Sequence, residues 1–280
     1  MLIALVLLAS VGAACGFCAG KEAFCSPQWL WLLPVSFVVS LVVFTLLALA
    51  FFLVASLVVD TGKPQTRDSK FYRRLVEIYL AALRTVLRIR IHTQGLEHVP
   101  ATGRFLLVCN HCHDSDPAML LSVLEGKQLA FIAKREVMDY FLVGKLLHKL
   151  LGQPMNREND REALKAILRC IQILQEDVAS IAVFPEGYIY PDRKLHHFRH
   201  GVFKIAKKAK VPVVVCTMTG TKDVFYNILH GKSLDIQLHF LGTIPVEEHE
   251  NLTTVQLSEH VYDMMAADLG PENVSPEQNT

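Results

Sequence analysis

The sequence predicts an α/β fold, a mostly parallel sheet flanked by helices, preceded by N-terminal transmembrane helices. Two long apolar stretches open the chain, and 51% of its 280 residues are hydrophobic. Beyond residue 94, short apolar runs alternate with helical patterns, which is typical of a parallel sheet with helical connections. About 200 residues form one such domain rather than two.

The second apolar stretch, Trp29 to Val59, contains no Asp, Glu, Lys or Arg. A helix of about 20 residues crosses a bilayer, so this stretch predicts a transmembrane helix, with Pro34 near its start. The first stretch, Met1 to Ala19, is either a cleaved signal peptide or a retained helix. It lacks the positive N-terminal region of signal peptides. We therefore expect residues 1–62 to form a membrane anchor of two hydrophobic helices.

Basic residues cluster directly after this anchor. Between Lys63 and Arg90 there are eight basic residues and two acidic ones, whereas the loop before Trp29 has one of each. The positive-inside rule then places everything after Val59 in the cytoplasm, so we expect localisation to the cell membrane with the folded domain on the cytoplasmic side. The basic cluster favours membrane lipids as partners. A net charge of +1 gives no indication of nucleic-acid binding.

The rest of the chain divides into three regions. Residues 63–93 carry an amphipathic pattern over Lys70–Ile91, which fits either a core-packing helix or a helix on the membrane surface. Residues 94–270 hold the α/β domain, and residues 271–280 form a polar tail that we expect to be disordered. The predicted strands are Arg104–Cys109, Leu129–Ala133, Ser180–Phe184, Pro212–Met218 and Asp235–Leu241, and the predicted helices are Pro117–Glu125, Arg135–Leu151, Asp160–Asp177, Arg199–Lys210 and Thr254–Leu269.

The segment Cys109–Pro117, CNHCHDSDP, leaves the first predicted strand and enters a helix, with Asp116 as the expected N-cap. Ligands of open α/β sheets bind at this carboxyl end of the strands. His111 is suited to act as a general base, and Asp116 can hold its second ring nitrogen if the chain turns back between them. The alternative is that Asp116 only caps the helix.

The same segment allows two other interpretations. Its C-x-x-C-H pattern is that of c-type haem attachment, and Cys109, Cys112 and His113 are potential metal ligands. Haem attachment takes place on the outer side of the membrane, against the expected orientation, and no second Cys/His pair with zinc-like spacing follows. We therefore predict no metal and no cofactor, and keep a membrane-tethered metal- or haem-binding protein as the alternative.

Three further segments are candidates for substrate binding. Phe184-Pro185-Glu186-Gly187 follows a predicted strand, so Glu186 is expected at the same end of the sheet as His111. Arg157 can bind a phosphate bidentately. Val211–Val215 can line an acyl or acceptor pocket. Singly, the three segments also fit a turn, a surface arginine and a core strand.

Together and in this order, the four blocks resemble the glycerolipid acyltransferase family, which includes the 1-acylglycerol-3-phosphate acyltransferases. The resemblance extends over roughly Gln94 to Val246. The family's N-H-x-x-x-x-D pattern matches Asn110, His111 and Asp116, its F-P-E-G pattern matches Phe184 to Gly187, and its second and fourth blocks match Arg157 and Val211–Val215.

The resemblance implies transfer of a fatty acyl group from acyl-CoA or acyl-carrier protein to the free hydroxyl of a lysophospholipid. The first expected acceptor is lysophosphatidic acid, giving phosphatidic acid, and the alternatives are another lysolipid or glycerol 3-phosphate. His111 would deprotonate the hydroxyl and Asp116 would orient His111, without a covalent acyl-enzyme. The residues implied in substrate binding are Asn110, Arg157, Phe184, Pro185, Glu186 and Gly187.

One departure from the family concerns the headgroup. Many members follow F-P-E-G with Thr-Arg, and that arginine helps to hold the acceptor phosphate. This chain has Tyr188 and Ile189 there. Arg193 or Lys194 can take its place, or the acceptor is not a phosphomonoester. The departure leaves the reaction class intact and the headgroup open.

Overall fold

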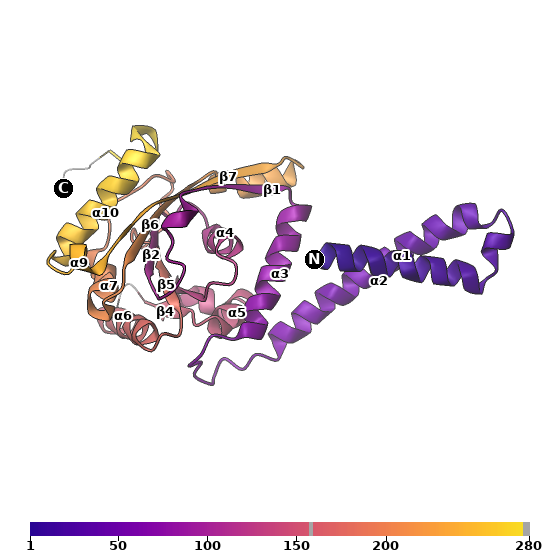
Figure 1. Ribbon diagram of the computed structural model, residues 1–280, viewed down its shortest axis with the longest axis horizontal. Helices are drawn as coiled ribbons and strands as arrows, with labels where there is room; N and C mark the ends of the chain where they lie inside the picture. The colour runs from indigo at the N-terminus through magenta and orange to yellow at the C-terminus, as the bar shows by residue number, and fades with distance from the viewer. Residues whose placement is uncertain (157–158, 277–280) are drawn as a thin grey trace. The chain divides into compact units, whose positions relative to one another are not determined.

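The computed structural model describes residues 1–156 and 159–276, which form two compact units divided between Asp60 and Thr61 (Figure 1). Arg157, implied in phosphate binding, lies outside the described residues. In the first unit, α1 (Leu2–Gly20) and α2 (Trp29–Leu57) form a helical hairpin around the short 3-10 helix η1 (Ala23–Cys25). Both long helices match the predicted apolar stretches and are candidate membrane spans by length and composition.

Small side chains line the contact between these two helices. Ser10, Ala14 and Cys18 recur every four residues on one face of α1 and are buried, and the Cys18 Sγ lies 3.8 Å from the Ser36 Oγ of α2. Small residues at such spacing allow helix backbones to approach closely in an apolar environment.

The second unit is built on one seven-stranded sheet in the order β1-β7-β6-β2-β5-β3-β4. All neighbouring strands are parallel except β6 and β7, which are antiparallel. The mostly parallel α/β fold predicted from the sequence is therefore confirmed. The strands are β1 (Ile89–Gln94), β2 (Leu106–Cys109), β3 (Leu129–Lys134), β4 (Gln153–Met155), β5 (Ser180–Val183), β6 (Val213–Thr219) and β7 (Leu234–Ile244).

Helices cover both faces of the sheet, as Figure 1 shows. Because successive side chains of a strand point to opposite faces, β2 contributes to two cores. Leu106 and Val108 pack with α6, α7 and α10, whereas Leu107 and Cys109 pack with α3 and α4. The helices of this unit are α3 (Lys70–Val86), α4 (Asp116–Val123), α5 (Val143–Lys149), α6 (Asp160–Gln175), α7 (Lys204–Ala209), α8 (Val224–Leu229), α9 (Val246–His249) and α10 (Thr254–Leu269).

The amphipathic segment was predicted to be helical to Ile91, but α3 ends at Val86 and β1 follows. Arg88 adopts a left-handed backbone conformation with φ 54°, which ends the helix, and the residues after it pair in parallel with β7. Both Arg73 and Glu77 of α3 are buried. One side of α3 therefore packs against the domain, and residues 63–93 belong to the same compact unit as the sheet.

Two predicted helices are broken. The segment Arg135–Leu151 contains the 3-10 helix η3 (Arg135–Asp139) before α5, and Gly144 of α5 lies directly against the Met138 carbonyl. The segment Arg199–Lys210 likewise starts with the 3-10 helix η4 (His200–Phe203) before α7.

The chain end was predicted to be disordered from residue 271, yet its described part is ordered. Pro271–Asn273 forms a 3-10 helix. The Leu195 N–H donates to the Asn273 carbonyl at 2.8 Å, and the Ser275 N–H donates to the Leu195 carbonyl at 2.9 Å. A polar composition did not prevent order here because backbone pairing with the buried Leu195 holds the segment.

Candidate active site

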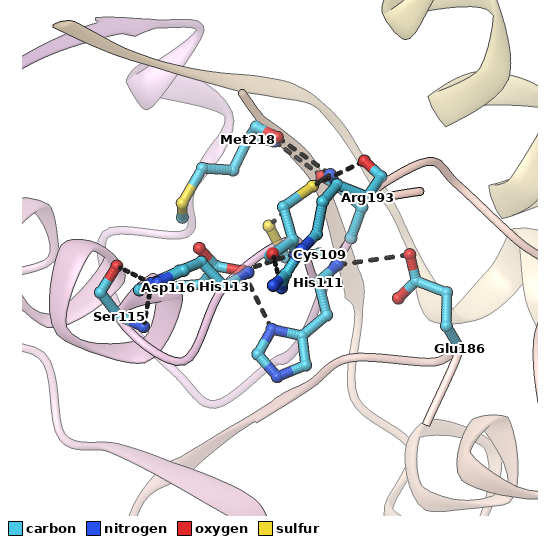
Figure 2. A network of polar contacts seen from close by, with 10 residues as sticks. Cys109, His111, His113, Ser115, Asp116, Glu186, Arg193 and Met218 are labelled. Atoms are coloured by element: carbon cyan, nitrogen blue, oxygen red, sulfur yellow. Dashed lines mark hydrogen bonds and ion pairs between the residues drawn. The ribbon is translucent and has the colours of Figure 1, made fainter. Parts of the chain in front are cut away.

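His111 and Asp116 meet at the carboxyl end of β2 (Figure 2). The His111 Nδ1–H donates to Asp116 Oδ2 at 2.9 Å, and the same oxygen accepts the backbone N–H groups of Cys112 at 2.7 Å and His113 at 2.8 Å. The chain thus turns back between the two residues, as the dyad hypothesis requires. Asp116 is not the expected N-cap, because it is the first helical residue and Ser115 precedes it as the cap.

This contact fixes the tautomer of the neutral imidazole. A carboxylate only accepts hydrogen bonds, so Nδ1 carries a proton, and in the neutral ring Nε2 keeps its lone pair. Figure 2 shows Nε2 on the side of the ring away from Asp116, and no residue that the structure describes bonds to it. The Asp116 side chain is fully buried while that of His111 is 14% exposed, so the orienting group is sheltered and the base is accessible.

Phe184 packs face to face on the His111 ring. Their ring centroids are 4.1 Å apart with an interplanar angle of 18°, and Phe131 of β3 supports Phe184 from a centroid distance of 6.4 Å. Because one edge of the imidazole is held by Asp116 and one face by Phe184, the ring has little freedom to rotate. The first residue of the Phe184–Gly187 block therefore orients the base.

Glu186 lies beneath the His111 loop rather than open to solvent. Its Oε1 accepts the His111 N–H at 3.3 Å, and its side chain is almost fully buried (Figure 2). Within the described part of the chain, Oε2 is buried and has no hydrogen-bond partner. Burial raises the pKa of Glu186 to about 8, since the charged form has lost its hydration.

Asn110 and Gly187 support the loops around these groups. The Asn110 amide donates to the Met218 carbonyl at 2.9 Å and accepts the Met218 N–H at 2.7 Å, so it bridges β2 and β6 as a short piece of strand would. Gly187 has φ +73°, a conformation that side-chain-bearing residues rarely adopt. The Arg199 N–H closes the same turn by donating to the Pro185 carbonyl at 2.8 Å.

Arg193 is hydrogen-bonded to the His111 loop, a role that the sequence did not indicate. Its Nη1 donates to the Cys112 carbonyl at 2.7 Å, and the Cys112 thiol donates to the Arg193 carbonyl at 3.5 Å. The sequence offered Arg193 only as a possible phosphate ligand. No local sequence signal could reveal these bonds, because Arg193 and Cys112 are 81 positions apart.

The potential metal ligands of this loop are engaged in other contacts. His113 is buried, and its Nδ1 lies 2.9 Å from the Ser115 Oγ. Cys109 is buried and lies opposite Cys216 in the register of the parallel strands β2 and β6. Burial raises the pKa of the Cys109 thiol and raises that of Cys112 to about 12, which disfavours the thiolates that bind metals. Over residues 1–156 and 159–276, no three His, Cys, Asp or Glu side chains converge on a metal position.

A cavity of about 110 Å³ borders the His111 loop, and its lining includes Asn110, Cys112, Arg193, Gly220 and Lys222. A larger cavity of about 540 Å³ lies elsewhere, between residues 61–66 and the edge strand β4. It is lined by neither His111, Asp116 nor Glu186. The polar geometry, and not the cavity size, marks the candidate active site.

Residues 90–219, which include His111, Asp116 and Glu186, match the family model described as Acyltransferase. This segment is an acyltransferase-family domain. The resemblance inferred from the four sequence blocks is thus confirmed.

The acyltransferase domain has curated relatives and a solved structural neighbour. The chloroplastic 1-acyl-sn-glycerol-3-phosphate acyltransferase LPAT1 of Arabidopsis thaliana is 32% identical over 155 residues, which cover 54% of this chain and 43% of that protein. The human 1-acyl-sn-glycerol-3-phosphate acyltransferase alpha is 27% identical over 153 residues, covering 54% and 53%. The chain thus spans about half the length of these relatives.

The crystal structure of the 1-acyl-sn-glycerophosphate (LPA) acyltransferase PlsC from Thermotoga maritima superposes with a TM-score of 0.60 at 22% identity. The match covers 82% of this chain and 90% of that one. At this identity the likeness establishes a shared fold for the acyltransferase domain.

Proposed function

We propose that this chain is an acyltransferase that moves a fatty acyl group from an acyl thioester to the free hydroxyl of lysophosphatidic acid, giving phosphatidic acid. The observation that carries the proposal is the His111–Asp116 pair, whose 2.9 Å contact leaves Nε2 without a partner among the described residues. The names of the curated relatives supply the acceptor, because they are 1-acyl-sn-glycerol-3-phosphate acyltransferases.

The proposed reaction needs one proton relay. His111 Nε2 takes the proton of the acceptor hydroxyl as its oxygen attacks the thioester carbonyl, and a tetrahedral oxyanion forms. When the oxyanion collapses, the C–S bond breaks and the imidazolium returns the proton to the departing thiolate. The products are an ester and a free thiol. The Asp116 carboxylate stabilises the imidazolium between these steps.

We propose acyl-CoA or acyl-carrier protein as the donor, and no cofactor. The reaction balances with the thioester as the only activated group, so neither a metal nor a redox group is required by the chemistry. The side chains around His111 are consistent with this scheme, because Phe184 and Glu186 hold the base in place and leave its Nε2 accessible.

We also propose that α1 and α2 anchor the enzyme in the cell membrane with the acyltransferase domain on the cytoplasmic side. The apolar character of both helices and the basic residues after position 62 support this arrangement. A bilayer-dissolved acceptor would then reach the enzyme without leaving the membrane.

The test is acylation by membranes that contain the full chain. Membranes are supplied with an acyl-CoA and a panel of lysolipids, and the products are followed by mass spectrometry. We expect phosphatidic acid with the wild type, its loss with His111→Ala, and no effect of His230→Ala, which replaces an exposed histidine of the loop after α8. Product formation by His111→Ala at the wild-type rate would remove the dyad from the mechanism.

A further inference from the structure

The proposed acceptor carries a phosphate monoester, whose negative charge the carboxylate of the dyad repels. The two carboxyl groups that contact His111, those of Asp116 and Glu186, are both buried. A phosphate close to them requires a cation with free donors. Because Tyr188 and Ile189 follow Gly187, the first Lys and Arg residues after this block are Arg193, Lys194 and Arg199.

One of the three Lys and Arg residues between positions 190 and 199 is bonded to the His111 loop, and a second lies beside a backbone contact with the chain end. The Arg193 guanidinium is bonded to the Cys112 carbonyl at 2.7 Å. Lys194 directly precedes Leu195, whose backbone pairs with Asn273 and Ser275 at the chain end. The backbone beside Lys194 is therefore tied to the C-terminal segment.

Arg199 is the basic residue that returns to this turn. Its N–H donates to the Pro185 carbonyl at 2.8 Å, and its side chain lies directly against Gly187. A Cβ at position 187 would lie 2.9 Å from both Cδ and Nε of Arg199, so the absence of a side chain there leaves room for the arginine. Arg199 is exposed, and its guanidinium has no hydrogen-bond or ion-pair partner among residues 1–156 and 159–276.

We infer that Arg199, seated on Gly187, binds the phosphate of the acceptor and determines the preference for a phosphate-bearing lysolipid. The inference rests on the proposed acyltransferase activity and assigns its headgroup contact. A guanidinium provides paired N–H donors that match two phosphate oxygens. The glycine and the arginine act together, because each position depends on the other: Gly187 makes the space, and Arg199 supplies the charge.

The first experiment compares two acceptors that differ only in the phosphate, lysophosphatidic acid and monoacylglycerol, with the full chain in nanodiscs. For Arg199→Ala we expect the KM for lysophosphatidic acid to rise about tenfold or more, as the loss of a charge-assisted hydrogen bond predicts. The KM for the acyl donor and the activity on monoacylglycerol should stay unchanged. Arg199→Lys should restore part of the loss, and Lys194→Ala should match the wild type.

Gly187→Ala provides an independent perturbation of the same contact. It should raise the KM for lysophosphatidic acid in the same direction, and adding Arg199→Ala should cause little further increase. A purely structural role of Arg199 would lower activity on both acceptors equally, and that outcome would overturn the inference while leaving the proposed function intact.

Binding is measured separately, so that the two proposals can fail separately. Fluorescent lysophosphatidic acid is titrated onto His111→Ala protein in nanodiscs, with and without Arg199→Ala. A loss of affinity of about tenfold supports the inference even if the wild type acylates a different lysolipid. Equal affinity of the two proteins would overturn it, even if the wild type makes phosphatidic acid.

Discussion

A single oxygen organises the candidate active site. Oδ2 of Asp116 accepts one imidazole N–H and two backbone N–H groups, so the carboxylate both orients His111 and shapes the loop that carries it. All three of these donors belong to the loop that precedes α4, and among the described residues the second oxygen, Oδ1, is buried without a hydrogen-bond partner.

Asp116→Asn should therefore impair the chemical step far more than substrate binding. An amide oxygen still accepts a backbone N–H, but the amide cannot balance the imidazolium charge and favours the wrong tautomer of His111. We expect kcat to fall about 10³-fold or more, in line with the same change in other carboxylate–histidine pairs, with KM nearly unchanged. Initial rates with lysophosphatidic acid and an acyl-CoA measure both constants, and a fall in kcat of less than tenfold would contradict the assigned role.

Glu186 should make the stability of the protein depend on pH. Burial raises its pKa from 4.5 to about 8, so the folded state holds this proton more tightly than the unfolded state. Its contribution to stability is present in full below about pH 4.5 and is lost as the pH rises through 8, with a slope of up to about 1.4 kcal/mol per pH unit.

Glu186→Gln removes this titration and serves as the matched control. Thermal unfolding of the two proteins in detergent, followed from pH 5 to pH 9, should show the wild type losing stability relative to the variant as the pH rises. Parallel curves across this range would show that Glu186 is ionised in the folded protein.

Two turns near the sheet contain glycines with positive φ but different surroundings. Gly95 connects β1 to the following turn with φ +68°, and a Cβ there would lie 2.1 Å from the Phe240 carbonyl of β7. Gly103 also has positive φ, at +81°, but a Cβ on it would meet no atom within 4 Å. Alanine at each of these two positions therefore separates the free-energy cost of backbone strain from the cost of steric overlap.

Gly95→Ala should cost about 1–3 kcal/mol more than Gly103→Ala, because only the first forces the β1–β7 edge of the sheet apart. Both variants share the strain of an alanine in a left-handed conformation. The difference in melting temperature between the two full-length variants measures the steric part. Equal melting temperatures would mean that β7 moves aside at little cost.

The elements that the sequence predicted well are those with strong local patterns. The strand Leu106–Cys109 and its loop to Asp116 were placed correctly, because an apolar run followed by Asp-Pro is a local signal. The strand β4 has only three residues and contains Pro154, so no alternation could reveal it. The end of α3 depends on the single left-handed residue Arg88, and sequence periodicity does not report backbone conformation.

In the candidate site, too, local sequence patterns predicted some residues, whereas long-range contacts that the sequence does not report determine others. His111, Asp116 and Glu186 were predicted to lie together because the loops that hold them follow predicted strands, and parallel strands end at one edge of the sheet. The roles of Arg193 and Arg199 depend on contacts with Cys112 and Gly187 that no spacing in the sequence encodes. The stack of Phe184 on His111 likewise follows from the neighbouring positions of β2 and β5.

At the scale of the whole molecule, the two N-terminal helices predict how the protein fractionates. If α1 and α2 span the membrane, the full chain should remain in the membrane pellet after an alkaline carbonate wash, which releases peripheral proteins. Protease added to inside-out vesicles should degrade the acyltransferase domain, and intact spheroplasts should protect it. Degradation in spheroplasts instead would reverse the expected orientation.

The burial of the thiols around the dyad has a practical consequence for measuring turnover. Burial raises the pKa of Cys109, and it raises that of Cys112 to about 12, so these two thiols stay protonated near neutral pH. Each proposed transfer from acyl-CoA releases one free thiol into solution. A chromogenic disulfide reagent can therefore report product formation continuously, in real time, without modifying the cysteines next to His111.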